Sequence, residues 1–249
     1  MKNKFSSLKF YLLALFLYVF IAEFIFPGNK FIPQIAILQD SFLSLFSNYS
    51  LIENLLSTFS TLLIGVLIGT GIFSLFQIYF PKFLNIFSGG NLSTEKILFV
   101  FILIAIYFIS SGFKSLLTAS MLTSVFIFFF ACNIFMRLQI HKQYADYLNL
   151  ASQFNKSEKE KNTIVLLDFL PKLKGKFTSL YYSTLIFLII YEYIDNNFGL
   201  GYVINHLLSN HDLSGLVAFI IFIYVFFVVS EKLFLFLLNR IIFWDSLNE

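Results

Sequence analysis

The sequence predicts an all-α integral membrane protein with about six transmembrane helices. Hydrophobic residues make up 58% of the chain and charged residues only 12%, with a mean hydropathy of +0.82. Soluble domains carry about 25% charged residues, so most of this chain needs an apolar solvent. Its long apolar runs are close to the roughly 20 residues that cross a bilayer as a helix. We interpret all 249 residues as one transmembrane domain.

Six apolar runs, separated by polar or charged segments, are the predicted spans. The third is short, and residues 112–115 join it to the fourth as a helical hairpin. The first starts with lysines, as a signal peptide does, but no small-x-small cleavage site follows it, so we expect it to stay uncleaved. The six runs are Leu8–Phe26, Asn54–Phe80, Lys96–Ser111, Leu116–Leu138, Phe177–Ile194 and Leu213–Lys232.

Two further patterns refine these boundaries. Segment Phe31–Phe46 has apolar residues at helical spacing and is expected to form a helix that lies along the outer membrane interface or caps the bundle. All prolines are expected at helix ends or in connections, because proline in a helix interior removes a hydrogen bond and clashes with the preceding turn. They are Pro27, Pro33, Pro81 and Pro171.

The basic residues predict the orientation of the spans. With the N-terminus inside, 15 of the 17 Lys and Arg residues fall on the inner face, and only Lys30 and Lys114 fall outside. The positive-inside rule therefore places both termini in the cytoplasm. The largest inner loop is then about 139–176, between the fourth and fifth spans.

The sequence carries no motif of a catalytic or cofactor site. It has no GxxxxGK[ST], HExxH, GxSxG or CxxC pattern, and its three histidines lack the spacing of metal ligands. Cys132 is the single cysteine, and the net charge of +3 is too small and scattered to indicate nucleic acid. We therefore expect no cofactor, no metal and no nucleic-acid partner.

Three glutamates lie in or near the spans, where a charge costs about 2.5–3.5 kcal/mol at the bilayer centre. Glu23 and Glu231 are near span ends and can reach the interface. Glu192 is within one turn of Asp195 and the outer surface, so both a solvated and a cavity-facing position are open. Separately, Gly65 and Gly69 form a GxxxG pattern, for which we expect a helix-packing role.

The inner loop contains a short amphipathic segment, Tyr144–Ser157. Its apolar residues share one helical face. Asp146 suits the positive end of the helix dipole, and Asn155 suits a left-handed helix end. Such a helix is either a docking element for another protein or a solvated loop helix without a partner.

The order of these features resembles the permeases of binding-protein-dependent ABC importers of the nitrate, sulfonate and taurine type. In that family the inner loop carries Glu-Ala-Ala, three residues and Gly, then an apolar-x-Leu-Pro element. Here the first motif falls on Asn149, Leu150, Ala151 and Asn155, and the second on residues 165–168, so the glutamate, the first alanine, the glycine and the proline are replaced. The family's outer motif is intact, as Glu192, Gly199, Leu200, Gly201 and Tyr202.

The likeness covers about residues 54–244, including Trp244 after Arg240, and leaves 8–26 as an extra span. It implies a type I permease fold in a bacterial inner membrane, with a permease homodimer as the pathway. It also implies a separate ABC ATPase, so that the chain itself is not an enzyme, and an extracytoplasmic solute-binding protein that meets the outer loops around 31–46 and 198–213. The implied ATPase-coupling residues are Asp146, Leu148, Asn149, Leu150, Ala151, Phe154, Asn155 and Ser157.

Other classes of membrane protein remain as alternatives. A membrane-embedded enzyme needs polar groups converging at one depth, and the spans offer only Ser, Thr and isolated acids. Vitamin-type energy-coupling transporters use two arginine-bearing coupling helices, whereas this inner loop has only Arg137 at its edge. Secondary carriers and channels often show internal repeats or charged intramembrane pairs, and neither is found. Nothing in the spans specifies the substrate.

Overall fold

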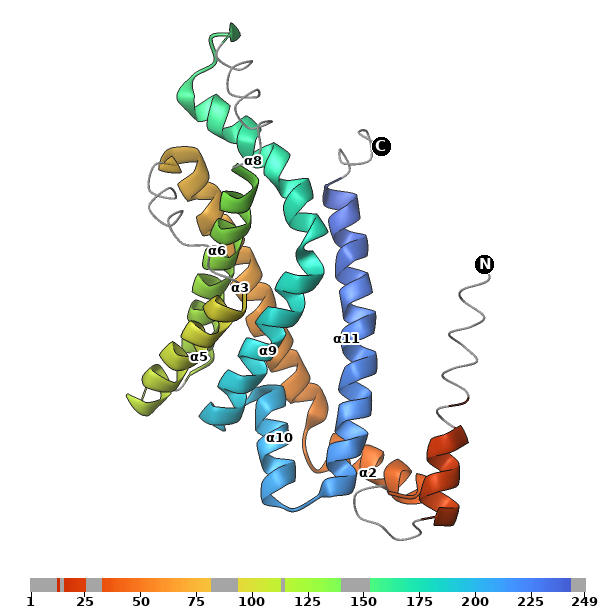
Figure 1. The fold of residues 1–249 in the computed structure, drawn as a ribbon. Coiled ribbons are helices and arrows are strands. Elements are labelled where there is room, and N and C mark those ends of the chain that lie inside the picture. Colours follow the sequence, from red (N-terminus) through yellow and green to blue (C-terminus); the bar gives the residue numbers. More distant parts are fainter. Residues whose placement is uncertain are drawn as a thin grey trace. The chain divides into compact units, whose positions relative to one another are not determined.

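The described part of the protein is entirely helical. The computed structural model describes residues 13, 16–25, 33–81, 94–112, 115–139 and 153–242, and within these ranges it contains helices and no strand (Figure 1). Four helices are long and apolar enough to cross a membrane: Leu51–Tyr79, Leu117–Phe135, Phe177–Asp195 and Leu213–Ile241. The predicted all-α membrane character is therefore confirmed at this level.

The other two predicted spans are shorter than a full crossing where they are described. The helix at Phe16–Ile25 ends in a π-helical turn, η1 (Ile21–Ile25), and α5 (Thr94–Ser110) has 17 residues. The predicted outer helix is present as α2 (Ile35–Ser47). By its internal contacts the chain forms two compact units: Met1–Glu53 with Val203–Phe227, and Asn54–Tyr202 with Val228–Glu249.

In the larger unit, α3 (Leu51–Tyr79) packs closely against α6 (Leu116–Gln139) at the GxxxG pattern. A Cβ on Gly65 would lie 2.5 Å from Thr123 Cγ2, and one on Gly69 would lie 2.6 Å from the Ser124 carbonyl oxygen. This is the close approach expected of small residues at that spacing.

An aromatic core joins α5, α6 and α9 (Phe177–Asp195). The Phe126 and Phe187 rings stack at 5.4 Å with an interplanar angle of 10°, and Phe101 meets Phe126 edge-on at the same distance. Such pairs add about 0.5–1.5 kcal/mol each beyond the area they bury. The phenylalanines of these helices therefore build the interior of this unit.

A second cluster holds α8 (Glu158–Gly175) against α3 and α6. Phe169 of α8 lies 5.2 Å from Phe73 of α3 and 5.2 Å from Phe135 of α6, between ring centroids. Cys132 is buried in this cluster at 2% exposure. The second half of the inner loop is thus a packed helix that leads directly into α9 (Figure 1).

Two boundary predictions are wrong. Pro171 lies inside α8 rather than at its end or in a connection. Proline removes only one backbone bond, and the Lys172 ammonium bridges to Asp168 across the same turn at 2.6 Å. The last predicted span was expected to end at Lys232, but α11 (Leu213–Ile241) continues for two more turns of mostly apolar residues.

Hydroxyl groups of α9 hold α11 near the predicted end of that span. Glu231 accepts hydrogen bonds from the Thr178 hydroxyl and the Tyr182 hydroxyl, both at 2.8 Å, and the Tyr181 and Ser230 hydroxyls are 2.5 Å apart. Because the Glu231 carboxylate has protein donors, the charge does not stop the helix there.

The smaller unit is organised by acids at helix N-termini. Glu23 Oε1 accepts the Ile35 amide at 3.1 Å, which caps α2. Asp212 Oδ1 accepts the Gly215 amide at 2.8 Å in the first turn of α11, and its other oxygen accepts from the Tyr49 hydroxyl at 3.1 Å. Glu23 therefore caps α2. From the sequence we expected only that its side chain could reach the membrane interface.

Candidate functional site

The predicted outer motif forms the corner between α9 and α10 (Gly199–Ser209). After α9, Asn196 takes a left-handed conformation with φ of 55°, and its amide donates to the Glu192 carbonyl at 3.0 Å. Gly199, the first residue of α10, has φ of 87°, a region that glycine enters at little cost. Two left-handed residues within four positions therefore turn the chain sharply.

The Glu192 side chain lies at the N-terminus of α10 and is completely buried. Its Oε2 accepts the Gly201 amide at 3.1 Å, and the Thr58 hydroxyl of α3 lies 2.7 and 2.8 Å from the two carboxylate oxygens. Within the described residues, no Lys or Arg forms an ion pair with this carboxylate. The Gly201 amide and the Thr58 hydroxyl are its hydrogen-bond partners instead. The solvated position that the sequence left open is thereby excluded.

Thr58 and Asn54 extend this arrangement to the neighbouring amides. The Leu200 amide donates to Thr58 Oγ1 at 2.9 Å, and the Thr58 hydroxyl in turn donates to Glu192. Asn54, one turn earlier on α3, accepts the Gly199 amide with Oδ1 at 2.9 Å. The first amides of a helix have no partner within that helix. Here the first three amides of α10 all find buried side-chain acceptors.

Both glycines of the motif, Gly199 and Gly201, occupy positions where a larger side chain would not fit. A Cβ on Gly199 would overlap the carboxyl group of Glu192, and a Cβ on Gly201 would overlap the Ile189 carbonyl oxygen and the Tyr193 nitrogen of α9. The start of α10 therefore lies directly on the last turns of α9, with no room for a larger residue.

The remaining residues of the corner are also placed by the structure. Leu200 is fully buried and Tyr202 is half-buried. Asp195, at the end of α9, is buried and accepts the Asn197 side-chain amide at 3.1 Å. All five predicted outer residues thus lie in the first turn of α10 or directly beneath it.

Most of the predicted inner motif lies outside the described residues: Asp146, Leu148, Asn149, Leu150 and Ala151. The description resumes at Gln153, which is helical. Asn155 then has φ of 50°, the left-handed conformation that the sequence led us to expect, and the Phe154 side chain is 74% exposed. An exposed aromatic residue therefore precedes α8 directly.

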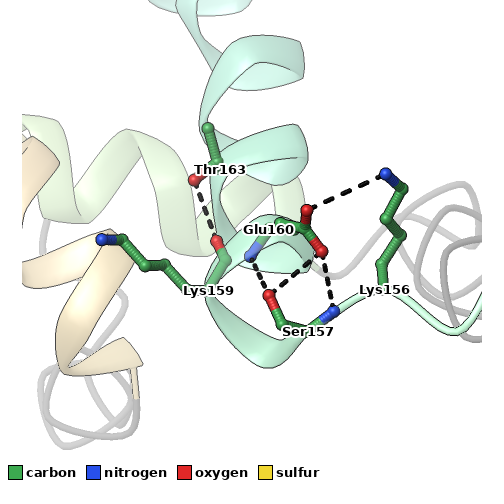
Figure 2. A network of polar contacts seen from close by, with 5 residues as sticks. All are labelled: Lys156, Ser157, Lys159, Glu160 and Thr163. Carbon is green, nitrogen blue, oxygen red and sulfur yellow. Dashed lines mark hydrogen bonds and ion pairs between the residues drawn. The ribbon is translucent and has the colours of Figure 1, made fainter.

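Ser157 begins α8 with a capping box, shown in Figure 2. The Ser157 hydroxyl accepts the Glu160 amide at 3.3 Å, and Glu160 Oε2 accepts the Ser157 amide at 2.9 Å. Lys156 Nζ is 3.9 Å from the other Glu160 oxygen. The bonds from Ser157, with the nearby Lys156 charge, lower the pKa of the Glu160 carboxyl group because they favour its charged form. This cap fixes where α8 starts.

Two contacts hold the first turns of α8 against the C-terminal end of α3. The Asn162 side-chain amide donates to the Ile78 carbonyl oxygen at 3.1 Å, one of the last carbonyls of α3. The Lys159 ammonium lies 4.8 Å from the centre of the Tyr79 ring, within range of a cation–π contact. Residues 158–162 are therefore fixed to the membrane-spanning core.

Sequence reasoning missed three residues of these sites: Glu160, Thr58 and Asn54. Ser157 and Glu160 form the S-x-x-E pattern of a capping box, so this part was available as a signal. Thr58 and Asn54 stand in an apolar run 134 or more residues before their partners, and nothing local marks them. Only the rule that a buried acid needs hydrogen-bond donors pointed to some partner for Glu192.

No group of three His, Cys, Asp or Glu side chains that could hold a metal ion occurs in the described ranges. Comparisons with family models, with curated proteins and with solved structures found no match to this chain.

Proposed function

We propose that this chain is the permease subunit of an ATP-driven solute importer of the binding-protein-dependent type. The observation that carries the proposal is the outer corner, where Glu192, Gly199 and Gly201 each have a defined structural role. A motif with three positions that have defined structural roles is a stronger basis for a resemblance than a matching string of letters. The four helices able to cross a membrane supply the setting that such a subunit requires.

The inner face gives a second line of support. An exposed Phe154 and a left-handed Asn155 stand directly before a helix that is capped and fixed to α3. A coupling element needs an exposed surface on a rigid support, so that force on the surface reaches the spans. In this proposal the segment 144–157 contacts a separate ATPase, and the outer loops meet a solute-binding protein. The chain then works as a homodimer in a bacterial inner membrane with both termini inside.

Purification of the tagged full-length chain in mild detergent, followed by mass spectrometry of bound proteins, tests the assignment. We expect an ABC ATPase to co-purify, and an extracytoplasmic binding protein to be captured after cross-linking. Recovery of the chain without any ATPase would contradict the proposal. Solute uptake that persists without ATP would favour a secondary carrier instead.

The position of the ATPase contact is tested by Phe154→Asp with Phe154→Tyr as the matched control. The aspartate places a charge where we expect an apolar contact, whereas the tyrosine keeps the ring. We expect loss of ATPase recovery and uptake for the first variant and retention for the second. Unchanged ATPase recovery with Phe154→Asp would show that Phe154 is not in the interface.

A further inference from the structure

A buried carboxyl group fills the space at the N-terminus of α10, where a helix often binds a ligand. Helix N-termini are ready anion sites, because their free amides and the helix dipole both favour negative charge. In α10 the amides of Gly199, Leu200 and Gly201 all donate to buried side chains, and Glu192 provides the only carboxyl group among these acceptors. Its fit is tight, since a Cβ on Gly199 would overlap the carboxyl group.

The same carboxylate connects three helices. It belongs to α9, takes the Gly201 amide of α10, and takes the Thr58 hydroxyl of α3. Thr58 is itself fully buried and also accepts the Leu200 amide, so this residue of α3 is bonded to both α9 and α10. Removing the carboxyl group would therefore free the Gly201 amide and leave the Thr58 hydroxyl only the Asn54 carbonyl oxygen of its own helix, 3.2 Å away, as an acceptor.

We infer that Glu192 is a positioning residue, whose buried carboxyl group fixes the start of α10 on α9 and α3. A group that binds solute or carries protons to it must be reachable, whereas Glu192 is 0% exposed and committed to protein donors. Within the proposed importer, the residue sets the position of α10 in the outer loop region rather than contacting the transported solute. The statement about the transported solute rests on the proposed function, whereas the positioning role of Glu192 does not.

The inference predicts that a small soluble carboxylate can replace the side chain. In Glu192→Ala the two donors, the Gly201 amide and the Thr58 hydroxyl, remain and a space about the size of a small carboxylate is left. We expect backbone amide exchange of residues 199–201 to rise about tenfold or more, since a buried bond of this kind is lost. Formate or acetate should reverse the effect in a saturable way, while chloride at the same ionic strength should not.

Glu231→Ala is the matched control. Glu231 also accepts two hydroxyl hydrogen bonds, but it does not lie at a helix N-terminus. We expect no reversal by formate in this variant and no change in exchange at residues 199–201. Hydrogen exchange at residues 158–161, the start of α8, should be unchanged in both variants.

If Glu192→Ala does not fold, Glu192→Gln carries the test. Glutamine keeps one oxygen as an acceptor but replaces the second oxygen near Thr58 by an NH2 donor, so the amides of residues 200 and 201 should exchange several-fold faster than in the wild type. Exchange at wild-type rates in Glu192→Gln, or a failure of formate and acetate to slow exchange in a folded Glu192→Ala, would overturn the inference. Absence of an ATPase partner would refute the proposed function alone, because exchange and rescue are measured on the isolated chain.

Discussion

Glu192 and Glu160 both accept hydrogen bonds at the start of a helix, but they do so in opposite surroundings. Glu160 is exposed and caps its own helix, α8, through Ser157, three residues away. Glu192 is buried and caps α10 from α9, together with Thr58 of α3, which is 134 residues away. If the Glu160 cap is lost, water can replace its hydrogen bonds, so the effect should stay within the first turn of α8. Water cannot reach the buried Glu192, so losing its hydrogen bonds should disturb the packing of α3, α9 and α10 at the corner.

The corner around Glu192 is tightly packed, whereas the cap at Glu160 is exposed. Gly201→Ala tests this difference in packing and should have the largest effect. Its Cβ would overlap backbone atoms of α9, so we expect a loss of about 3 kcal/mol in stability, at the upper end for overpacking. Gly71→Ala on α3 is the control. Nothing lies within 4 Å of the added methyl group, and the helix should gain about 0.5–1 kcal/mol. Thermal unfolding followed by circular dichroism in detergent compares the two, and equal midpoints would contradict the packed corner.

Thr58 bonds to two other helices, whereas an ordinary buried hydroxyl bonds only within its own helix. Thr58→Val removes the hydrogen bond to Glu192 and the acceptor of Leu200, so we expect a loss of about 2 kcal/mol. Thr61, one turn later on α3, is equally buried but bonds only to the Ser57 carbonyl of its own helix. Thr61→Val should stay within about 0.5 kcal/mol of the wild type. A similar loss in both variants would mean that Thr58 has no special role.

The third prediction concerns the exposed cap. Ser157→Ala removes the hydroxyl that accepts the Glu160 amide, which costs about 1 kcal/mol at a helix N-terminus. Because the site is local, we expect faster amide exchange at residues 158–161 and no change at residues 199–201. A change that spread to α10 would show that the two ends of the molecule are coupled more tightly than their contacts indicate.

The smallest effect is the pH dependence of the same cap. The pKa of Glu160 is lowered in the folded protein, so its contribution is fully present above the pKa of the unfolded chain and is lost as pH falls through the folded pKa. We therefore expect the start of α8 to exchange faster at acid pH, after correction for intrinsic rates, and Glu160→Gln to remove this dependence. Protection that grew on acidification would contradict the assignment.

The same comparison shows what the sequence could reveal. Membrane character, helix existence and the glycine contact at Gly65 follow from patterns within one or two turns, and they appear in the structure. The Ser157 cap was equally local and could have been recognised. The partners of Glu192 could not, because Asn54 and Thr58 look like ordinary polar residues in an apolar helix until folding brings α3 beside α9.

The two wrong boundaries have a common cause. Charged and proline residues were expected to end helices, but Lys232 follows a glutamate that already has donors, and Pro171 stands in a helix packed on α3 and α6. In both cases tertiary contacts offset a local penalty. Local rules therefore work best in this chain where a helix end is exposed, as at Ser157.

Cys132 gives the chain a practical property. It is the single thiol of the sequence, and its side chain is enclosed by the aromatic cluster of α3, α6 and α8. Polar maleimide reagents in solution do not reach such a position. The natural protein should therefore stay unlabelled and serve as the control. A cysteine placed at an exposed site such as Phe154 or His211 would be the only thiol to react, and the side of the membrane from which it reacts would map the orientation of the chain directly.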